Sequence, residues 1–251
     1  SGNAMPLTYS WTPVGMIATG SNTLTPTTTN LSGNTLYTLV VTDITGCQKA
    51  DQMNVIVTGT ALAISPTATP LAICEGGSSS LAVAASGGSG TYFYTWTSVP
   101  PGFNSNLSNV VVTPITTTTY TVSVFDGFNT MTGNVTIIVN PLPLQFAITG
   151  GGEYCTGGIG VDVGLAITQT NVNYQLELNG SPVGSPVTGT GAAISFGNQT
   201  SAGIYTVTAN NMISGCTNPM SGNVIVSINP LPSANAGSDQ VIPYGTSTTL
   251  G

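Results

Sequence analysis

A strand-like pattern recurs along this chain at a spacing of roughly 85 residues, and it constrains the fold more than any other feature. Tyr94-Thr95-Trp96 repeats Tyr9-Ser10-Trp11, and the runs led by Tyr37, Tyr120 and Tyr205 repeat one another. In each run, apolar or small side chains alternate with hydroxyl side chains, which is typical of a half-buried strand. We therefore predict several copies of one β-rich unit.

The alternation also predicts which aromatic side chains face the core. Tyr92 and Tyr94 share a strand face with Trp96, which assigns them to the core rather than to a sugar-stacking surface. The predicted core signature of the units is Trp11, Tyr37, Trp96, Tyr120 and Tyr205. The aromatic residues that we expect outside the core, near loops, are Phe93, Phe103 and Phe128.

The residues that separate the strand-sized runs indicate the fold class. Gly, Pro, Asn and Ser interrupt the strand-sized runs at short intervals, Asp126-Gly127 is a turn signal, and no amphipathic helical stripe is present. A Trp on one sheet and a Tyr-led strand on the other is the layout of an immunoglobulin-like sandwich. We predict an all-β chain of tandem immunoglobulin-like β-sandwich domains that form an extended rod.

Proline-rich joints divide the chain. Asn140-Pro-Leu-Pro143 recurs as Asn229-Pro-Leu-Pro232, and such segments suit short, stiff linkers. The predicted domains are a partial domain without its first strands at 1–62, complete domains at 63–142 and 143–231, and the start of a further repeat at 232–251.

Composition excludes several classes of function. Lys49 is the only cation, there is no His, and the net charge is −7. Binding of nucleic acid or of an anionic membrane surface needs several basic residues, and nucleophile–His catalysis needs an imidazole. No apolar run is long enough to suggest a membrane span.

The segments Ile73–Pro143 and Asn235–Leu250, with ICEGGSSSL, GGSGTYFYTW, TTTTYTVSVFDG and NAGSDQVIPYG, resemble the PKD-like/Ig-like repeats of giant Bacteroidota surface adhesins. Residues 150–228 resemble a second repeat type of the same proteins. The resemblance implies PKD-like domains, a bacterial cell-surface location, export by the type IX secretion system, and a role in adhesion or gliding motility.

The two ends of the chain are in the same register as internal repeats. Ser1-Gly2 aligns with Ser86-Gly87, and Leu250 aligns with Leu81. One interpretation is a window of a long array. The alternative is a strand-exchanging subunit, in which residues 233–251 of one molecule complete the partial domain of the next.

Four cysteines are present. Cys155 lies early in its repeat and Cys216 in its late turn, and we expect these two positions at the same end of a sandwich. We therefore predict a structural Cys155–Cys216 disulfide, which would indicate an oxidising compartment. A Cys47–Cys74 pairing stays open.

We assign no catalytic, cofactor-binding or metal-binding residue. The acids that could hold Ca²⁺ if they met at a domain end are Glu75, Asp126, Glu153 and Asp162. No calcium-loop motif is present, so solvated acids are the preferred interpretation. No acids are paired at short spacing on a strand, which argues against glycoside hydrolysis.

These patterns predict a non-enzymatic, extracellular stalk or fibre segment, and the resemblance implies that it belongs to a repetitive adhesin. Its partners would be neighbouring Ig-like repeats and surface glycans, with no nucleic acid and no insertion into a membrane. The alternatives are accessory repeats of a secreted polysaccharide-degrading enzyme and a subunit of a self-assembling filament.

Overall fold

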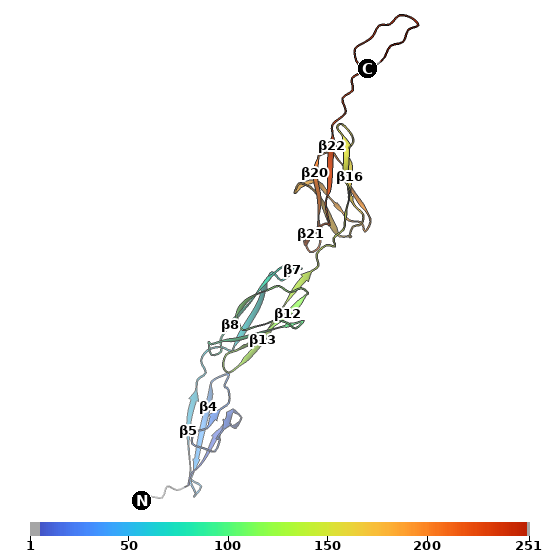
Figure 1. The fold of residues 1–251 in the computed structure, drawn as a ribbon. Coiled ribbons are helices and arrows are strands. Elements are labelled where there is room, and N and C mark those ends of the chain that lie inside the picture. The colour runs from blue at the N-terminus through green and yellow to red at the C-terminus, as the bar shows by residue number, and fades with distance from the viewer. Residues whose placement is uncertain (1–5, 250–251) are drawn as a thin grey trace. The chain divides into compact units, whose positions relative to one another are not determined.

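A computed structural model describes residues 6–249 as an all-β protein of several sheets (Figure 1), which confirms the predicted all-β class. The predicted register of the ends involves Ser1, Gly2 and Leu250, which lie outside the described residues. The chain divides into two compact units, Ser1–Val139 and Asn140–Gly251. The one helical element of residues 6–249 is the short 3-10 helix η1 (Val14–Met16), and no helix there could cross a membrane.

The first unit starts with a single sheet of order β1-β4-β5, which we call the half-sandwich (residues 8–55). A two-stranded sheet, β2-β3, accompanies it. The strands are β1 (Thr8–Thr12), β2 (Ile17–Thr19), β3 (Thr27–Thr28), β4 (Thr35–Thr42) and β5 (Gln48–Val55).

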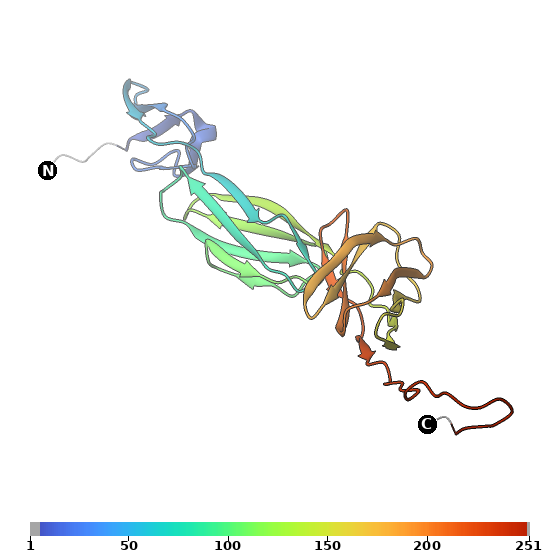
Figure 2. The same ribbon diagram turned by 90° about the horizontal axis from the view of Figure 1, so that it is seen from above.

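The middle sandwich (residues 63–140) has two facing sheets, of order β10-β9-β12-β13-β7 and β11-β8-β6. Figure 2 shows its long strands in cyan and green. The strands are β6 (Ala63–Thr69), β7 (Ala72–Cys74), β8 (Ser79–Ser86), β9 (Phe93–Val99), β10 (Asn104–Ser105), β11 (Asn109–Val112), β12 (Thr118–Phe125) and β13 (Thr130–Asn140).

The C-terminal sandwich (residues 148–229) has sheets of order β14-β16-β19 and β15-β22-β20-β17-β18, with β21 paired to β20. The strands are β14 (Ile148–Gly150), β15 (Gly152–Cys155), β16 (Val161–Leu165), β17 (Val172–Leu178), β18 (Ser181–Thr188), β19 (Ile194–Gln199), β20 (Gly203–Asn211), β21 (Thr217–Pro219) and β22 (Val224–Asn229). Residues 230–249, which we call the tail, form no strand. The predicted division of the chain into four domains stays a prediction.

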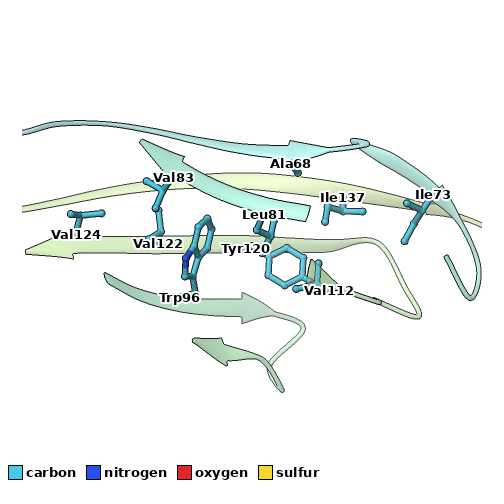
Figure 3. Packing of buried hydrophobic residues seen from close by; sticks show 10 residues of the cluster. All are labelled: Ala68, Ile73, Leu81, Val83, Trp96, Val112, Tyr120, Val122, Val124 and Ile137. Carbon is cyan, nitrogen blue, oxygen red and sulfur yellow. The ribbon is translucent and has the colours of Figure 1, made fainter. Parts of the chain in front are cut away.

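The core of the middle sandwich lies between its two sheets (Figure 3). Trp96 on β9 is fully buried and stands beside Val122 of β12 and Leu81 of β8. Alternation along β12 places Tyr120, Val122 and Val124 inside, as predicted. Tyr92 and Tyr94 are partly buried and pack against the same cluster, again as predicted.

The aromatic residues of the core signature are buried in all three sandwiches, with exposed fractions of 9% for Trp11, 2% for Tyr37, 0% for Trp96, 3% for Tyr120 and 1% for Tyr205. The Tyr205 hydroxyl donates a hydrogen bond to the Ser201 carbonyl, 2.9 Å away. This bond to the backbone just upstream is the tyrosine corner of immunoglobulin-like sandwiches.

The two tryptophans repeat each other in detail. The Trp96 indole N–H donates to the Leu107 carbonyl at 2.9 Å, and the Trp11 indole N–H donates to the Thr23 carbonyl at 3.0 Å. In register, Trp96 lies opposite Val122, and Trp11 lies opposite Leu39. The half-sandwich is therefore built on the same plan as the larger sheet of the middle sandwich.

Candidate functional site

A hydrogen-bonded turn follows the Tyr-led strand in each of the three sandwiches, and we call it the late turn. In the middle sandwich it is built on Asp126, whose carboxylate accepts hydrogen bonds from the backbone N–H groups of Phe128 (2.8 Å) and Asn129 (2.6 Å). The Ser89 N–H donates to the same carboxylate at 3.3 Å from a distant loop. Asp126 therefore ties the two loops together.

The same hydrogen-bonding pattern recurs in the late turns of the other two sandwiches. In the half-sandwich, the Asp43 carboxylate accepts from the N–H groups of Thr45 (2.8 Å) and Cys47 (3.0 Å). In the C-terminal sandwich an amide replaces the acid, and the side-chain oxygen of Asn211 accepts from the N–H of Ile213 at 2.9 Å. The late turn needs an acceptor oxygen at this position but not a charge.

These hydrogen bonds favour the ionised carboxylates. The backbone N–H of Asn129, followed by that of Phe128, lowers the pKa of Asp126 below its ordinary value. The side-chain hydroxyl of Thr45 is the main cause of a lowered pKa for Asp43, with smaller contributions from backbone N–H groups. Both acids thus act as structural acceptors.

The lowered pKa of Asp126 predicts that the middle sandwich is acid-sensitive. A depressed folded-state pKa contributes stability above the unfolded value, about 4, and this contribution is lost as pH falls through the folded-state pKa. Hydrogen exchange of β12 amides at neutral and acidic pH measures the loss. Asp126→Asn should flatten this pH dependence, since Asn211 already serves a late turn as a neutral amide. An unchanged acid slope in Asp126→Asn would contradict the assignment.

The acids that were considered as calcium ligands are not brought together. Asp126 binds backbone N–H groups, Asp162 accepts a hydrogen bond from the Ser195 hydroxyl, and Glu153 accepts one from the Asn229 side chain at 3.0 Å. Within residues 6–249, no three His, Cys, Asp or Glu side chains are grouped closely enough to hold a metal ion. A cleft of about 570 Å³ borders Asp126, whose carboxylate is already bound by backbone N–H groups.

An aromatic pair lies on the outer face of the middle sandwich. Phe93 on β9 and Phe125 on β12 are opposite each other in register, with ring centroids 6.4 Å apart and an interplanar angle of 36°. Their exposed fractions are 60% and 42%. Phe128, in the late turn, is also exposed. This outer aromatic pair is the candidate contact surface of the sandwich.

Two aromatic residues differ from expectation. Phe103 was expected outside, yet it packs edge-on against Tyr120 with the ring centroids 5.3 Å apart. It lies in a loop, where alternation gives no guidance. Phe125 was not among the residues predicted to face outward, although it follows inward-facing Val124 and the period of two places it outside.

The expected Cys155–Cys216 disulfide is not formed. Cys155 is a free, exposed thiol, whereas Cys216 is disulfide-bonded. β15 runs parallel to β22 and ends with Cys155 opposite Asn229, whereas Cys216 lies beyond Asn211 at the end of β20. Because β20 and β22 are antiparallel, the two cysteines lie at opposite ends of the sheet. Cys47, whose pairing with Cys74 was left open, is also a free, exposed thiol.

The states of the four cysteines predict the outcome of thiol labelling. In the absence of reductant, a thiol reagent should label Cys47 and Cys155 in the native protein, because both are exposed and free. Unfolding without reduction should reveal no further thiol, because Cys74 and Cys216 are disulfide-bonded. Peptide mapping of the unreduced protein reads the pairing directly. A Cys155–Cys216 peptide would contradict the structure.

Comparison with known proteins reveals fold-level likeness only. No protein-family model matches the sequence, and no curated protein matches it. Similar solved structures include three N-terminal domains of the outer capsid protein Hoc of bacteriophage RB49, with 14% identity, 92% of each chain covered and a TM-score of 0.41. Domains 3–5 of Drosophila OTK match at 13% identity over 90% of this chain and 86% of theirs, with a TM-score of 0.40. Fibronectin(III)-like modules of Clostridium thermocellum CbhA match at 7% identity over 66% and 95%, with a TM-score of 0.36. The fold assignment rests on the sheets themselves.

Proposed function

We propose that the chain is a non-enzymatic, extracellular stalk or fibre segment of a large repetitive cell-surface adhesin. The observation that carries the proposal is the tandem repetition of one sandwich plan, with the same buried Trp, Tyr-led strand and late turn. Repeated modules joined by proline-rich linkers make a protein long and able to carry load, and they suit such a role better than catalysis. The composition agrees, because it lacks the His, Arg and multiple Lys residues of most catalytic sites.

The disulfide supports an extracellular location. Structural disulfides form and persist in oxidising environments such as the outside of the cell. Cys74 and Cys216 are each disulfide-bonded, and the sequence contains no Cys-x-x-Cys motif of the kind found in redox-active disulfides. We infer that this bond is structural and that the protein functions in an oxidising compartment.

The strand pairing suits a mechanical role. β12 is hydrogen-bonded along its length to β9 on one side and to β13 on the other. Pulling it out would break many backbone hydrogen bonds between residues far apart in the sequence. The same arrangement holds β20 between β17 and β22 in the C-terminal sandwich.

The resemblance of Ile73–Pro143 to PKD-like adhesin repeats supports the finer proposal that the parent protein is a bacterial surface adhesin of the gliding-motility type. Immunogold electron microscopy of intact cells, with an antibody against residues 71–139, tests it. We expect label along fibres that leave the cell. Label confined to the medium, together with glycan-cleaving activity, would contradict the adhesin and favour an accessory module of a secreted enzyme.

The outer aromatic pair favours a second function, the binding of surface glycans. Aromatic faces stack on sugar rings, and neighbouring hydroxyls such as Thr95 and Ser123 share the outer face of the sheet with Phe93 and Phe125. Glycan-array binding by the protein should be lost in the double variant Phe93→Ala, Phe125→Ala. Val111→Ala, which alters an exposed residue of the opposite sheet, is the control. Equal binding by all variants would remove this role.

A further inference from the structure

Uncharged polar side chains form most of the outer face of the larger sheet of the middle sandwich. Directly paired residues of neighbouring strands lie on the same face, so the register of β9, β12 and β13 sets these side chains in rows across the sheet. We call this surface the hydroxyl face. Its rows are Phe93, Phe125 and Thr130; Thr95, Ser123 and Thr132; Thr97, Thr121 and Asn134; and Val99, Thr119 and Thr136.

The two middle rows of the hydroxyl face have hydrogen-bonding groups to offer. Their β9 and β13 side chains are exposed, and their β12 side chains are half-buried. In the last row, the Thr119 and Thr136 hydroxyls bond to each other at 2.8 Å. A hydroxyl can donate one hydrogen bond and accept two, so the middle rows suit a hydroxyl-rich ligand. The middle-row hydroxyls without a hydrogen-bond partner among residues 6–249 are those of Thr95, Thr97, Thr121, Ser123 and Thr132.

The outer aromatic pair forms the row at the other end of this face. Phe93 and Phe125 are directly followed along the strands by the hydroxyl rows, so a ligand that stacks on the rings meets hydroxyls next to them. The rings are inclined to each other by 36°, and the sheet beneath them is twisted. The two rings therefore cannot lie flat against one plane. This geometry favours a single flexible chain over the flat surface of a crystalline solid.

The composition of the hydroxyl face favours a glycan over a second copy of this protein. The centres of protein–protein interfaces are enriched in aromatic residues, Met and Arg and are depleted of Ser. Here the large apolar side chains lie in the end rows, at Phe93, Phe125 and Val99, and the middle rows carry hydroxyls and one amide. A sugar ring presents both an apolar C–H face and hydroxyl groups, so it matches this combination of side chains.

The charge of the face narrows the class of glycan. None of its side chains is charged, and the charged residues of the middle sandwich are Glu75 and Asp126. Asp126 is 2% exposed and binds backbone N–H groups. Recognition of a carboxylate or sulfate group needs Arg or Lys, and the one lysine, Lys49, lies on β5 of the half-sandwich. The face is therefore complementary to an uncharged glycan.

The corresponding face of the C-terminal sandwich has different side chains. With Tyr205 matched to Tyr120, the positions of the outer aromatic pair are held by Asn173 and Asn210, which are opposite each other in register. At the positions of Thr97 and Thr121 lie Glu177 and Thr206, and the Thr206 hydroxyl donates to the Glu177 carboxylate at 3.3 Å. Of the two complete sandwiches, the middle one thus combines the aromatic pair with uncharged hydroxyl rows.

We propose that the hydroxyl face binds a single uncharged polysaccharide chain, which stacks on Phe93 and Phe125 and continues along β12 over the two hydroxyl rows. The inference rests on the glycan-binding role proposed above, and it names the ligand class. Residues on one face of a strand are spaced by about 6.8 Å, so the aromatic row and the row of Thr121 are roughly 14 Å apart. This length requires a chain of several sugars.

Affinity electrophoresis of the whole protein tests the ligand class. The net charge of −7 draws the protein through a native gel, and a polysaccharide in the gel slows it when the two bind. Hydroxyethylcellulose and dextran are uncharged probes, and carboxymethylcellulose and dextran sulfate are anionic derivatives of the same two backbones. We expect slower migration with at least one uncharged polymer and weaker binding of its anionic derivative. Equal or tighter binding of an anionic derivative, or no binding of any polymer, would overturn the proposal.

Hydroxyl variants test the path of the chain. The double variant Thr97→Val, Thr121→Val removes two hydroxyls of one row and retains the branched shape of both side chains, so it should weaken binding by about tenfold. Thr67→Val, at an exposed position of β6 in the opposite sheet, is the matched control and should leave binding unchanged. Unchanged binding in the double variant would overturn the path along β12.

A lysine variant tests the exclusion of anionic glycans. Thr97→Lys places a cation on the hydroxyl face and should strengthen binding of the anionic derivative severalfold. Thr67→Lys makes the same change in net charge on the opposite sheet and should have a smaller effect. Equal effects of the two variants would show that the charge of this face does not select the ligand, and would overturn the proposal.

The outcomes separate this inference from the glycan-binding role on which it rests. Binding of an anionic glycan that the variant Phe93→Ala, Phe125→Ala loses would retain the aromatic pair as a glycan site and overturn the uncharged ligand class. Competition by fragments of the bound polymer completes the test. A hexasaccharide should displace the polymer at a concentration at least about tenfold lower than a disaccharide, because it reaches both hydroxyl rows. Equal potency would overturn the extended path.

Discussion

Replacing Trp96 by alanine is expected to lower the free energy of unfolding of the middle sandwich by about 3–5 kcal/mol. The indole is fully buried between the two sheets, so its removal leaves a cavity that the β-strands cannot close (Figure 3). The change also removes the donor at 2.9 Å from the Leu107 carbonyl, which then lacks this partner inside the protein.

The chain offers a matched control for this substitution. Trp11 makes the same hydrogen bond at 3.0 Å but lies in the half-sandwich, which is open on one face. Trp11→Ala should therefore give a smaller loss, because less packing is removed. Hydrogen exchange under increasing urea, read separately on peptides from β12 and β4, measures each sandwich by itself. Equal losses for the two variants would show that the covering sheet adds nothing to the burial of Trp96.

The inward and outward faces of the strands could be predicted because alternation is a local property. Once Tyr120 is placed inside, the period of two places Val122 and Val124 inside and Phe125 outside. The same reasoning assigned Tyr92 and Tyr94 to the core and Phe93 to the surface. Alternation makes no prediction for Phe103, because this residue reaches the core from a loop.

The role of Asp126 depends only in part on its neighbours in the sequence. Asp-Gly marks a turn, and the bonds to Phe128 and Asn129 follow from that turn. The bond from Ser89 depends on how a loop 37 residues away is placed, which the sequence does not state. The acceptor role of the carboxylate was therefore missed, and the acid was interpreted as solvated, with a calcium site as the alternative.

The predicted Cys155–Cys216 disulfide is wrong because of the sheet topology. The prediction treated the early strand as if its whole length stayed at one end of the sandwich. In fact β15 runs along β22, and Cys155 lies at the end opposite to the late turn. Cys155 and Cys216 therefore lie too far apart along the sheet to form a disulfide.

Replacing Gly150 by alanine is expected to destabilise the C-terminal sandwich by about 2–5 kcal/mol, for two separable reasons. Its φ of +87° is in the left-handed region, where an L side chain is strained by about 1–2 kcal/mol. A Cβ at this position would also lie 2.0 Å from the Asp162 carbonyl oxygen, so β14 and β16 would have to separate. Such overpacking adds about 1–3 kcal/mol.

Gly157 isolates the second reason, because its φ of +84° is nearly the same and a Cβ there would meet nothing within 4 Å. Gly157→Ala should therefore show the backbone strain alone, about 1–2 kcal/mol. Hydrogen exchange of β16 amides in increasing urea compares the two variants within one sandwich. The difference between their losses of unfolding free energy measures the cost of separating β14 from β16. Equal losses would mean that the pairing of Gly150 with Val163 is not what requires glycine at this position.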